Sequence, residues 1–246
     1  MLKAAKEGLT NIPKDHAVRS EIAEGMVQAG KHLDDTEVQL VGWHEAFYSS
    51  PSLSYLLSLL SVAEQRGCYK EEIHAAIARI ALLLEKGKKY QGSFVEDAEA
   101  RGSTTSGSLL NQAYLLAGRY EDAFNLCNNK EVLGWSDGHN PKGLAIPFFL
   151  ALLSRGKNLY STGNLERLWK EAVNNISGYS CNRQDMAERF QQAMEKVFRS
   201  IQISENEENK YMLWCMKETG LRVDAIVGEK HRKSYYKAAN LLVALA

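Results

Sequence analysis

Apolar side chains recur at helical spacing on both sides of Gly118. From 109 to 117, and again from 120 to 127, they stand three or four positions apart, which is the spacing of one face of an α-helix. Glycine suits the position just past a helix end, where the backbone turns left-handed and a side chain would be strained. The stretch therefore predicts two short helices that meet at Gly118. Each keeps apolar surface that only neighbouring helices can cover, as in a helical repeat.

The same spacing predicts helices along the rest of the chain. It is most regular at Ile73, Ile77, Ile80 and Leu84, and no stretch shows sustained alternation of apolar and polar positions. The predicted helices span about residues 2–8, 15–29, 34–48, 51–67, 69–87, 93–101, 109–117, 120–127, 141–153, 165–176, 182–201, 204–228 and 234 to the end.

Polar residues and prolines mark the starts of several of these helices. A capping box joins a polar N-cap residue to an acid three positions later, and proline suits the first position of a helix. Capping boxes are predicted at Asp34 with Glu37, Ser93 with Glu96 and Ser204 with Glu207. Proline at the first helical position predicts N-caps at Ser50, before Pro51, and at Asn140, before Pro141.

These patterns predict an all-α fold built from antiparallel helix pairs. Gly118, Tyr120 and Ala123 stand in the order found in tetratricopeptide (TPR) hairpins, and the stretch resembles that family. The resemblance implies a TPR-like α-α superhelix. We expect a single helical-repeat domain over 1–246, with a division near 88–107 into lobes 1–88 and 107–246 as the alternative.

Composition restricts the kind of partner. The chain has 246 residues, of which 45% are hydrophobic, enough for a sizeable core. Thirty Lys and Arg residues balance thirty Asp and Glu residues. No global field therefore draws a nucleic acid or an anionic membrane, and any charge-driven binding must be local.

The chain carries no targeting or metal-binding pattern. Its first residues lack the apolar core of a secretory signal, and the apolar run 144–153 is too short to span a membrane. The four cysteines stand far apart, without the paired spacing of a zinc site. We therefore expect a cytoplasmic protein with no membrane segment, metal or cofactor. The apolar last helix has no capping residue, and from this we expect the chain to be part of a longer protein.

The most unusual stretch is 221–239, where cations and tyrosines surround a predicted helix junction. Such a basic, aromatic-interleaved patch suits an acidic protein segment or a phosphate backbone. The alternative is a solvated loop with packed tyrosines, in which Arg222 and Asp224 take part in a partly buried structural salt bridge between helices. With the aromatic residue of the loop 132–139, the candidate binding residues are Trp135, Arg222, Asp224, Lys230, His231, Arg232, Lys233, Tyr235, Tyr236 and Lys237.

This stretch also resembles a known family. Arg-Val-Asp-Ala-Ile-Val at 222–227, Lys-His-Arg-Lys-Ser-Tyr at 230–235 and Lys-Ala-Ala at 237–239 are similar to the C-terminal helical region of bacterial proteins that carry a SWIM-type zinc finger. The Cys-x-Cys and Cys-x-His ligands of that finger are absent from this chain. The resemblance therefore implies a bacterial, helical, SWIM-associated region, with any zinc in a segment outside this chain.

The histidines of the chain form no pattern typical of a catalytic site. The six histidines form no His-Glu-x-x-His motif. His44 with Glu45, and Glu72 with His74, stand one or two positions apart, and such neighbours do not face each other on a helix. We therefore predict that the chain is not an enzyme. The predicted function is a non-catalytic scaffold for protein–protein interaction; nucleic-acid binding through residues 230–237 is the first alternative, and an enzyme of unrecognised type is the second.

Overall fold

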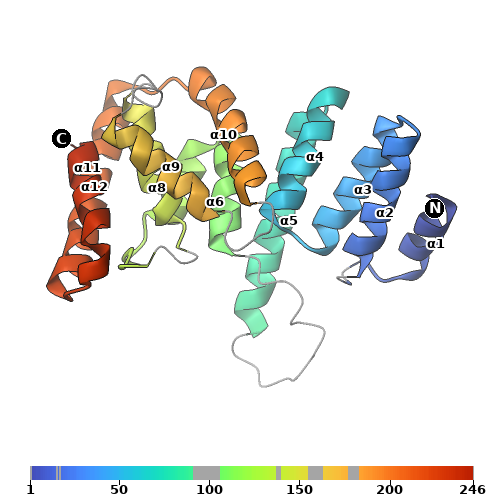
Figure 1. Ribbon diagram of the computed structural model, residues 1–246, viewed down its shortest axis with the longest axis horizontal. Helices are drawn as coiled ribbons and strands as arrows, with labels where there is room; N and C mark the ends of the chain where they lie inside the picture. Colours follow the sequence, from blue (N-terminus) through green and yellow to red (C-terminus); the bar gives the residue numbers. More distant parts are fainter. Residues whose placement is uncertain are drawn as a thin grey trace. The chain divides into compact units, whose positions relative to one another are not determined.

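The computed structural model describes residues 2–14, 16, 18–90, 106–136, 140–154, 163–176 and 183–245. Within these ranges the chain forms twelve α-helices and no β-strand, so the predicted all-α class is confirmed. The chain divides into two compact units, unit 1 (Met1–Ala113) and unit 2 (Tyr114–Ala246). Helix α6 (Gly107–Leu116) contains the point of division (Figure 1). The predicted helix at 93–101 lies outside the described residues.

In unit 1, successive helices pack side by side (Figure 1). Each helix from α1 to α4 contacts the next, and α5 also contacts α3. The apolar stripes predicted from sequence form the interfaces, so Leu56, Leu60, Ile73 and Ile80 are buried. The helices are α1 (Leu2–Asn11), α2 (Arg19–His32), α3 (Thr36–Ser49), α4 (Leu53–Arg66) and α5 (Tyr69–Tyr90).

Two glycines allow α2 and α3 to approach closely. A Cβ atom on Gly42 would lie 2.6 Å from Val27 Cγ2 and 3.0 Å from the Ala23 carbonyl oxygen. A Cβ atom on Gly30 would lie 3.0 Å from the Asp35 carbonyl oxygen. Because backbone atoms cannot move aside as a flexible side chain can, only glycine fits these two positions without shifting the helices.

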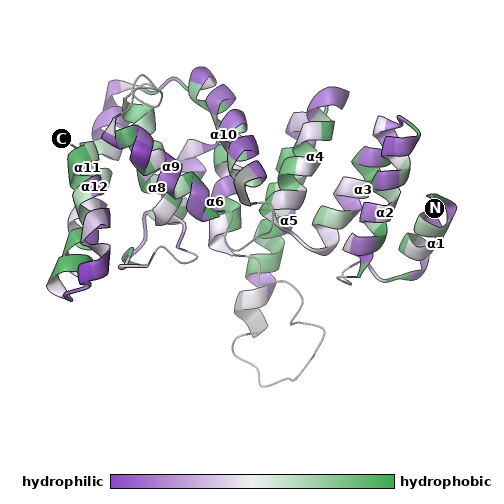
Figure 2. Cartoon of the chain, in the orientation of Figure 1, coloured by the Kyte–Doolittle hydropathy of each residue, from purple (hydrophilic) through white to green (hydrophobic). Residues whose placement is uncertain are grey.

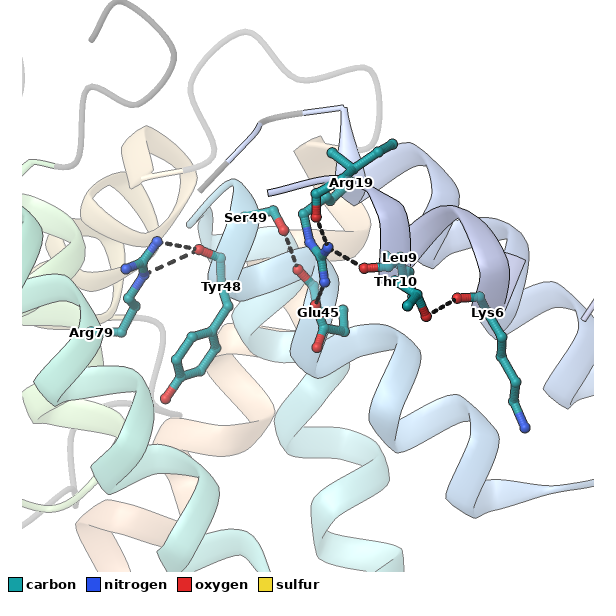
Figure 3. Close-up of polar contacts among 9 residues, drawn as sticks. Lys6, Leu9, Thr10, Arg19, Glu45, Tyr48, Ser49 and Arg79 are labelled. Atoms are coloured by element: carbon teal, nitrogen blue, oxygen red, sulfur yellow. Dashed lines mark hydrogen bonds and ion pairs between the residues drawn. The ribbon is translucent and has the colours of Figure 1, made fainter. Parts of the chain in front are cut away.

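Two arginines, one of them buried, hold the ends of helices in unit 1. The Arg19 guanidinium, 3% exposed, donates to the carbonyls of Leu9 and Ile12 at the end of α1 and to the Glu45 carboxylate of α3 (Figure 3). Arg79 donates to the Tyr48 carbonyl near the end of α3, with Nη2 at 2.8 Å. The last carbonyls of a helix have no partner within it and form its negative pole. Each arginine therefore caps a helix from a neighbouring element.

Unit 2 is centred on four helices that pack in a ring. Helix α8 contacts α9, α9 contacts α12, α12 contacts α11, and α11 contacts α8; we call these the four-helix group. The unit contains α7 (Tyr120–Cys127), α8 (Lys142–Leu153), α9 (Asn164–Ile176), α10 (Arg183–Ser200), α11 (Glu205–Val223), a π-helical turn (Asp224–Gly228), a 3-10 turn (Arg232–Ser234) and α12 (Tyr235–Leu245).

Aromatic side chains fill the centre of unit 2. The Phe149 ring of α8 lies 4.6 Å from the Tyr211 ring and 5.5 Å from the Trp214 ring of α11, between ring centroids. Phe124 of α7 contacts the same three rings edge-on or tilted. Edge-to-face contacts at these separations add to the free energy of area burial. This cluster fixes α11, whose far end carries the candidate site.

Four helix ends share one hydrogen-bonding pattern. The residue past the end adopts a positive φ, and the following N–H bonds to the carbonyl five positions back, as His231 does to Ile226. Gly67 and Gly118 occupy this position in two cases, which confirms the predicted turn at Gly118. The others are Asp34, of a type that tolerates this conformation, and Lys230, of a type that does not favour it.

Two predicted N-caps are wrong by one or two residues. Helix α3 is capped by Asp35, which accepts from the Val38 N–H at 3.1 Å, because Asp34 already forms the left-handed end of α2. Helix α4 is capped by Ser52 rather than Ser50. The box at Ser204 with Glu207 is confirmed, and Asn140 accepts from the Lys142 N–H at the start of α8 as predicted. The box predicted at 93–96 lies outside the described residues.

Candidate functional site

One end of the four-helix group contains a shallow hollow. There α8 begins, α9 and α11 end, and α12 begins, so one or more residues from each helix line it. The hollow is small: its volume is about 290 Å³ only when the open solvent side is counted, so it does not reach the size of an enclosed small-molecule site. The lining residues are Gly143, Pro147, Leu168, Glu171, Ala172, Asn175, Arg222 and Lys237.

The hollow offers both hydrogen-bond donors and acceptors. Arg222 and Lys237 supply cationic donors, and Glu171 supplies a carboxylate that accepts from Asn240 Nδ2 at 3.4 Å. Pro147 has no N–H, so the helical bond from position 147 to the Gly143 carbonyl cannot form. Gly143 itself is one of the residues that line the hollow. The lining therefore combines two cationic side chains with one carboxylate.

Beside the hollow, the structure brings Trp135 together with two residues of the 230–237 stretch. The Trp135 ring stacks on the His231 ring at 5.1 Å between centroids and 26° between planes. Lys237 Nζ donates to the Trp135 carbonyl at 3.4 Å. Trp135 nevertheless remains 50% exposed. The loop and the helix junction, about a hundred residues apart in sequence, thus form one surface.

The other cations and the tyrosines form the rim of this surface. Lys230, Arg232 and Lys233 are exposed in the turn between the π-helical segment and α12. Tyr235 and Tyr236 follow them at the start of α12, and both are exposed, so the tyrosine packing expected in the alternative is wrong, while its solvated basic loop stays an alternative interpretation of the exposed cations. We call Trp135, Lys230, His231, Arg232, Lys233, Tyr235, Tyr236 and Lys237 the basic-aromatic surface.

Arg222 and Asp224 occupy different environments. Arg222 is 6% exposed and lines the hollow, whereas Asp224 is exposed at the start of the π-helical turn. The structural salt bridge between helices that was predicted for these residues stays a prediction. The acid that pairs with the junction is Glu229, whose Oε2 lies 3.0 Å from His231 Nε2. The local charge is therefore positive, with Glu229 partly offsetting it.

A buried ion pair that the sequence did not reveal holds the Trp135 loop. Lys142 and Glu218 are each 1% exposed, and Lys142 Nζ lies 2.9 Å from Glu218 Oε2. The same ammonium donates to the carbonyls of Asn129 and Glu131, at the start of the loop. Because all three ammonium protons have acceptors, the charge is satisfied without water. Lys142 thereby anchors the loop that presents Trp135.

Two buried cysteines lack nucleophilic character. Cys127 and Cys215 are buried, and burial raises the pKa of the Cys127 thiol to about 12 and raises that of Cys215 as well. Thiols in this state carry almost no thiolate at neutral pH. Within the described ranges no three His, Cys, Asp or Glu side chains gather as metal ligands would.

In unit 1 the histidine neighbourhoods follow the predicted helical geometry. His44 does not pair with Glu45, nor Glu72 with His74. His44 Nδ1 lies 2.9 Å from Glu72 Oε2 instead, linking α3 to α5, while Glu45 binds Arg19. The His44 ring also stacks on Tyr48 at 4.2 Å. This pair connects two helices, and no spacing rule within one helix could have found it.

Comparison with family models, with curated proteins and with solved structures finds no match to this chain. Among the helices of the described ranges, none is long and apolar enough to cross a membrane.

Proposed function

We propose that the chain is a non-catalytic, TPR-like helical scaffold of a cytoplasmic bacterial protein, and that its basic-aromatic surface binds an acidic segment of a partner protein. The observation that carries this proposal is Trp135, held half exposed against His231 and Lys237 at the basic end of the four-helix group. Large aromatic and arginine side chains dominate the energy of protein interfaces. An exposed tryptophan fixed in position loses little entropy on binding.

The hollow supports a protein segment over a small substrate. It is too small and open to enclose a substrate, and Arg222 and Lys237 line it with cationic groups from two helices. A carboxylate of an acidic segment would enter the hollow while an apolar neighbour packs on Trp135. The SWIM-associated, helical-repeat assignment from sequence is part of the same proposal, since such arrays bind extended segments along their surfaces.

Nucleic-acid binding is the second candidate, because Lys230, Arg232 and Lys233 are exposed beside stacking-competent aromatic rings. Fluorescence anisotropy of labelled single- and double-stranded DNA and RNA, at low and high salt, separates the two. The scaffold proposal predicts no salt-sensitive binding. Binding that weakens steeply with salt, and is lost in a Lys230→Ala, Arg232→Ala, Lys233→Ala variant, would establish the nucleic-acid function instead.

A further inference from the structure

Helix α11 buries an apolar side and exposes two large apolar residues beside Lys217 on the other. At helical spacing on the buried side are Tyr211, Trp214 and Cys215, against the rest of unit 2. On the opposite side of the helix, Leu213 is 66% exposed and Met216 is 51% exposed. A surface helix normally carries polar residues on its outer side, so these two need a separate explanation.

Helix α12 repeats the arrangement. It buries Ala238 and Leu241, while Leu242 and Val243 are about half exposed. Because α11 packs on α8, α12 packs on α9, and α8 and α9 pack together, the free sides of α11 and α12 both point away from the α8–α9 pair. In Figure 2, hydrophobic and hydrophilic segments alternate along the ribbons of α11 and α12. We call Leu213, Met216, Leu242 and Val243 the outer apolar face.

These residues lie at one level along the helix pair. Met216 precedes the turn at Lys230 by fourteen residues and Val243 follows it by thirteen, so a rise of about 1.5 Å per residue places each about 20 Å from the turn. The α11–α12 pair thus has an apolar centre. It has cations at the turn, namely Lys230, Arg232 and Lys233.

The other end of the pair is acidic. Glu205, Glu207 and Glu208 occupy the first turn of α11, and Glu205 lies about 17 Å from Met216 on the side away from the cations, by the same helical rise. In each copy the basic turn and the acidic start of α11 lie about equally far from Met216, on opposite sides of it. A two-fold axis near Met216 would therefore place the basic turn of one copy opposite the acidic start of α11 in the other.

We propose that two copies of this chain associate through the outer apolar face, with their α11–α12 pairs antiparallel about a two-fold axis near Met216. Apolar side chains pack at the centre of this interface, and Lys230 and Arg232 of each copy face Glu205 and Glu208 of its partner. The pairing is self-complementary in both hydropathy and charge, which an isologous interface requires. The hollow and Trp135 lie outside the apolar centre, whereas Lys230 and Arg232 belong both to the basic-aromatic surface and to this interface.

Sedimentation velocity over a range of concentrations tests the apolar centre. The proposal predicts a reversible dimer whose Kd is raised at least about 1,000-fold in a Leu213→Glu, Met216→Glu variant, since a hot-spot side chain contributes a factor of about 30 and occurs twice. Leu82→Glu replaces a similarly exposed leucine in unit 1 and serves as the control, with unchanged Kd. A monomer at every concentration, or a dimer insensitive to the double variant, would overturn the proposal.

Charge reversal tests the orientation. Glu205→Lys, Glu208→Lys and, separately, Lys230→Glu, Arg232→Glu each place like charges across both ends of a homodimer, so each variant alone should associate more weakly. Mixed together, the two variants restore opposite charges at both ends and should form a heterodimer, detectable by native mass spectrometry. Failure of the mixture to associate better than either variant would refute the antiparallel arrangement. The Leu213→Glu, Met216→Glu variant retains Trp135 and the hollow, so acidic-segment binding can be measured separately in the monomer.

Discussion

Replacing Lys142 by Met removes the cation from the most deeply buried ion pair described in unit 2. The Glu218 carboxylate, 1% exposed, then loses the ammonium that binds its Oε2. Its Oε1 already has no hydrogen-bond partner among the described residues, so the buried charge is left without compensation. The carbonyls of Asn129 and Glu131 also lose their donor. Removing one member of a buried pair costs about 3–5 kcal/mol, and we expect unit 2 to be destabilised by that amount.

Hydrogen-exchange mass spectrometry of the full chain measures this effect by segment. The Lys142→Met variant should lose protection in α8 and α11, and the loop carrying Trp135 should become more accessible to acrylamide quenching. Lys170→Met is the control, because Lys170 forms an exposed i,i+4 pair with Glu166 that contributes about 0.5 kcal/mol or less. A double change of Lys142 and Glu218 to Met should cost less than the sum of the single changes. A Lys142→Met cost below about 1 kcal/mol would refute the anchoring role.

Three further predictions concern helix ends and buried groups. Arg19→Met should destabilise unit 1 by about 2–4 kcal/mol and raise amide exchange in α1, whereas Arg66→Met, at an exposed pair, should cost less than about 1 kcal/mol in the same experiment. Lys230→Gly should raise the free energy of unfolding measured by urea denaturation, and Gly118→Ala should lower it, each by about 1 kcal/mol, because both residues have positive φ; equal effects in one direction would contradict this. Burial raises the pKa of the Cys127 thiol from 9.0 to about 12, so the folded state favours the neutral thiol. The stabilisation that comes from burying this thiol is complete below pH 9 and is lost between pH 9 and 12. A urea midpoint that stays constant over that range would contradict this.

The elements of the fold were predictable because their signals are local. The apolar stripes predicted the helices of both units. Gly118 adopts the left-handed conformation at a helix end, and the Ser204–Glu207 capping box starts α11, both as predicted. The errors at Asp34 and Ser50 have a physical cause: a neighbouring residue of the same type also caps, and tertiary packing selects between them. Sequence spacing cannot make that selection.

The candidate site was only partly predictable. The cluster at 230–237 is contiguous in sequence, and Trp135 stood out by its residue type. What connects them depends on residues far apart: Lys142 binds Glu218 across 76 positions. A lone lysine near a helix start resembles any surface lysine, so no local signal marks it as buried. Packing of α8 against α11 alone creates that site.

The most direct test of the scaffold proposal is an anisotropy titration of a short labelled peptide of alternating Glu and Leu with the protein and with a Trp135→Ala, Lys237→Ala variant. Val132→Ala, in the same loop and also exposed, is the control. The account predicts that the protein and the control bind the peptide and that the double variant binds at least tenfold more weakly. Absence of binding, or equal binding by all three proteins, would contradict it.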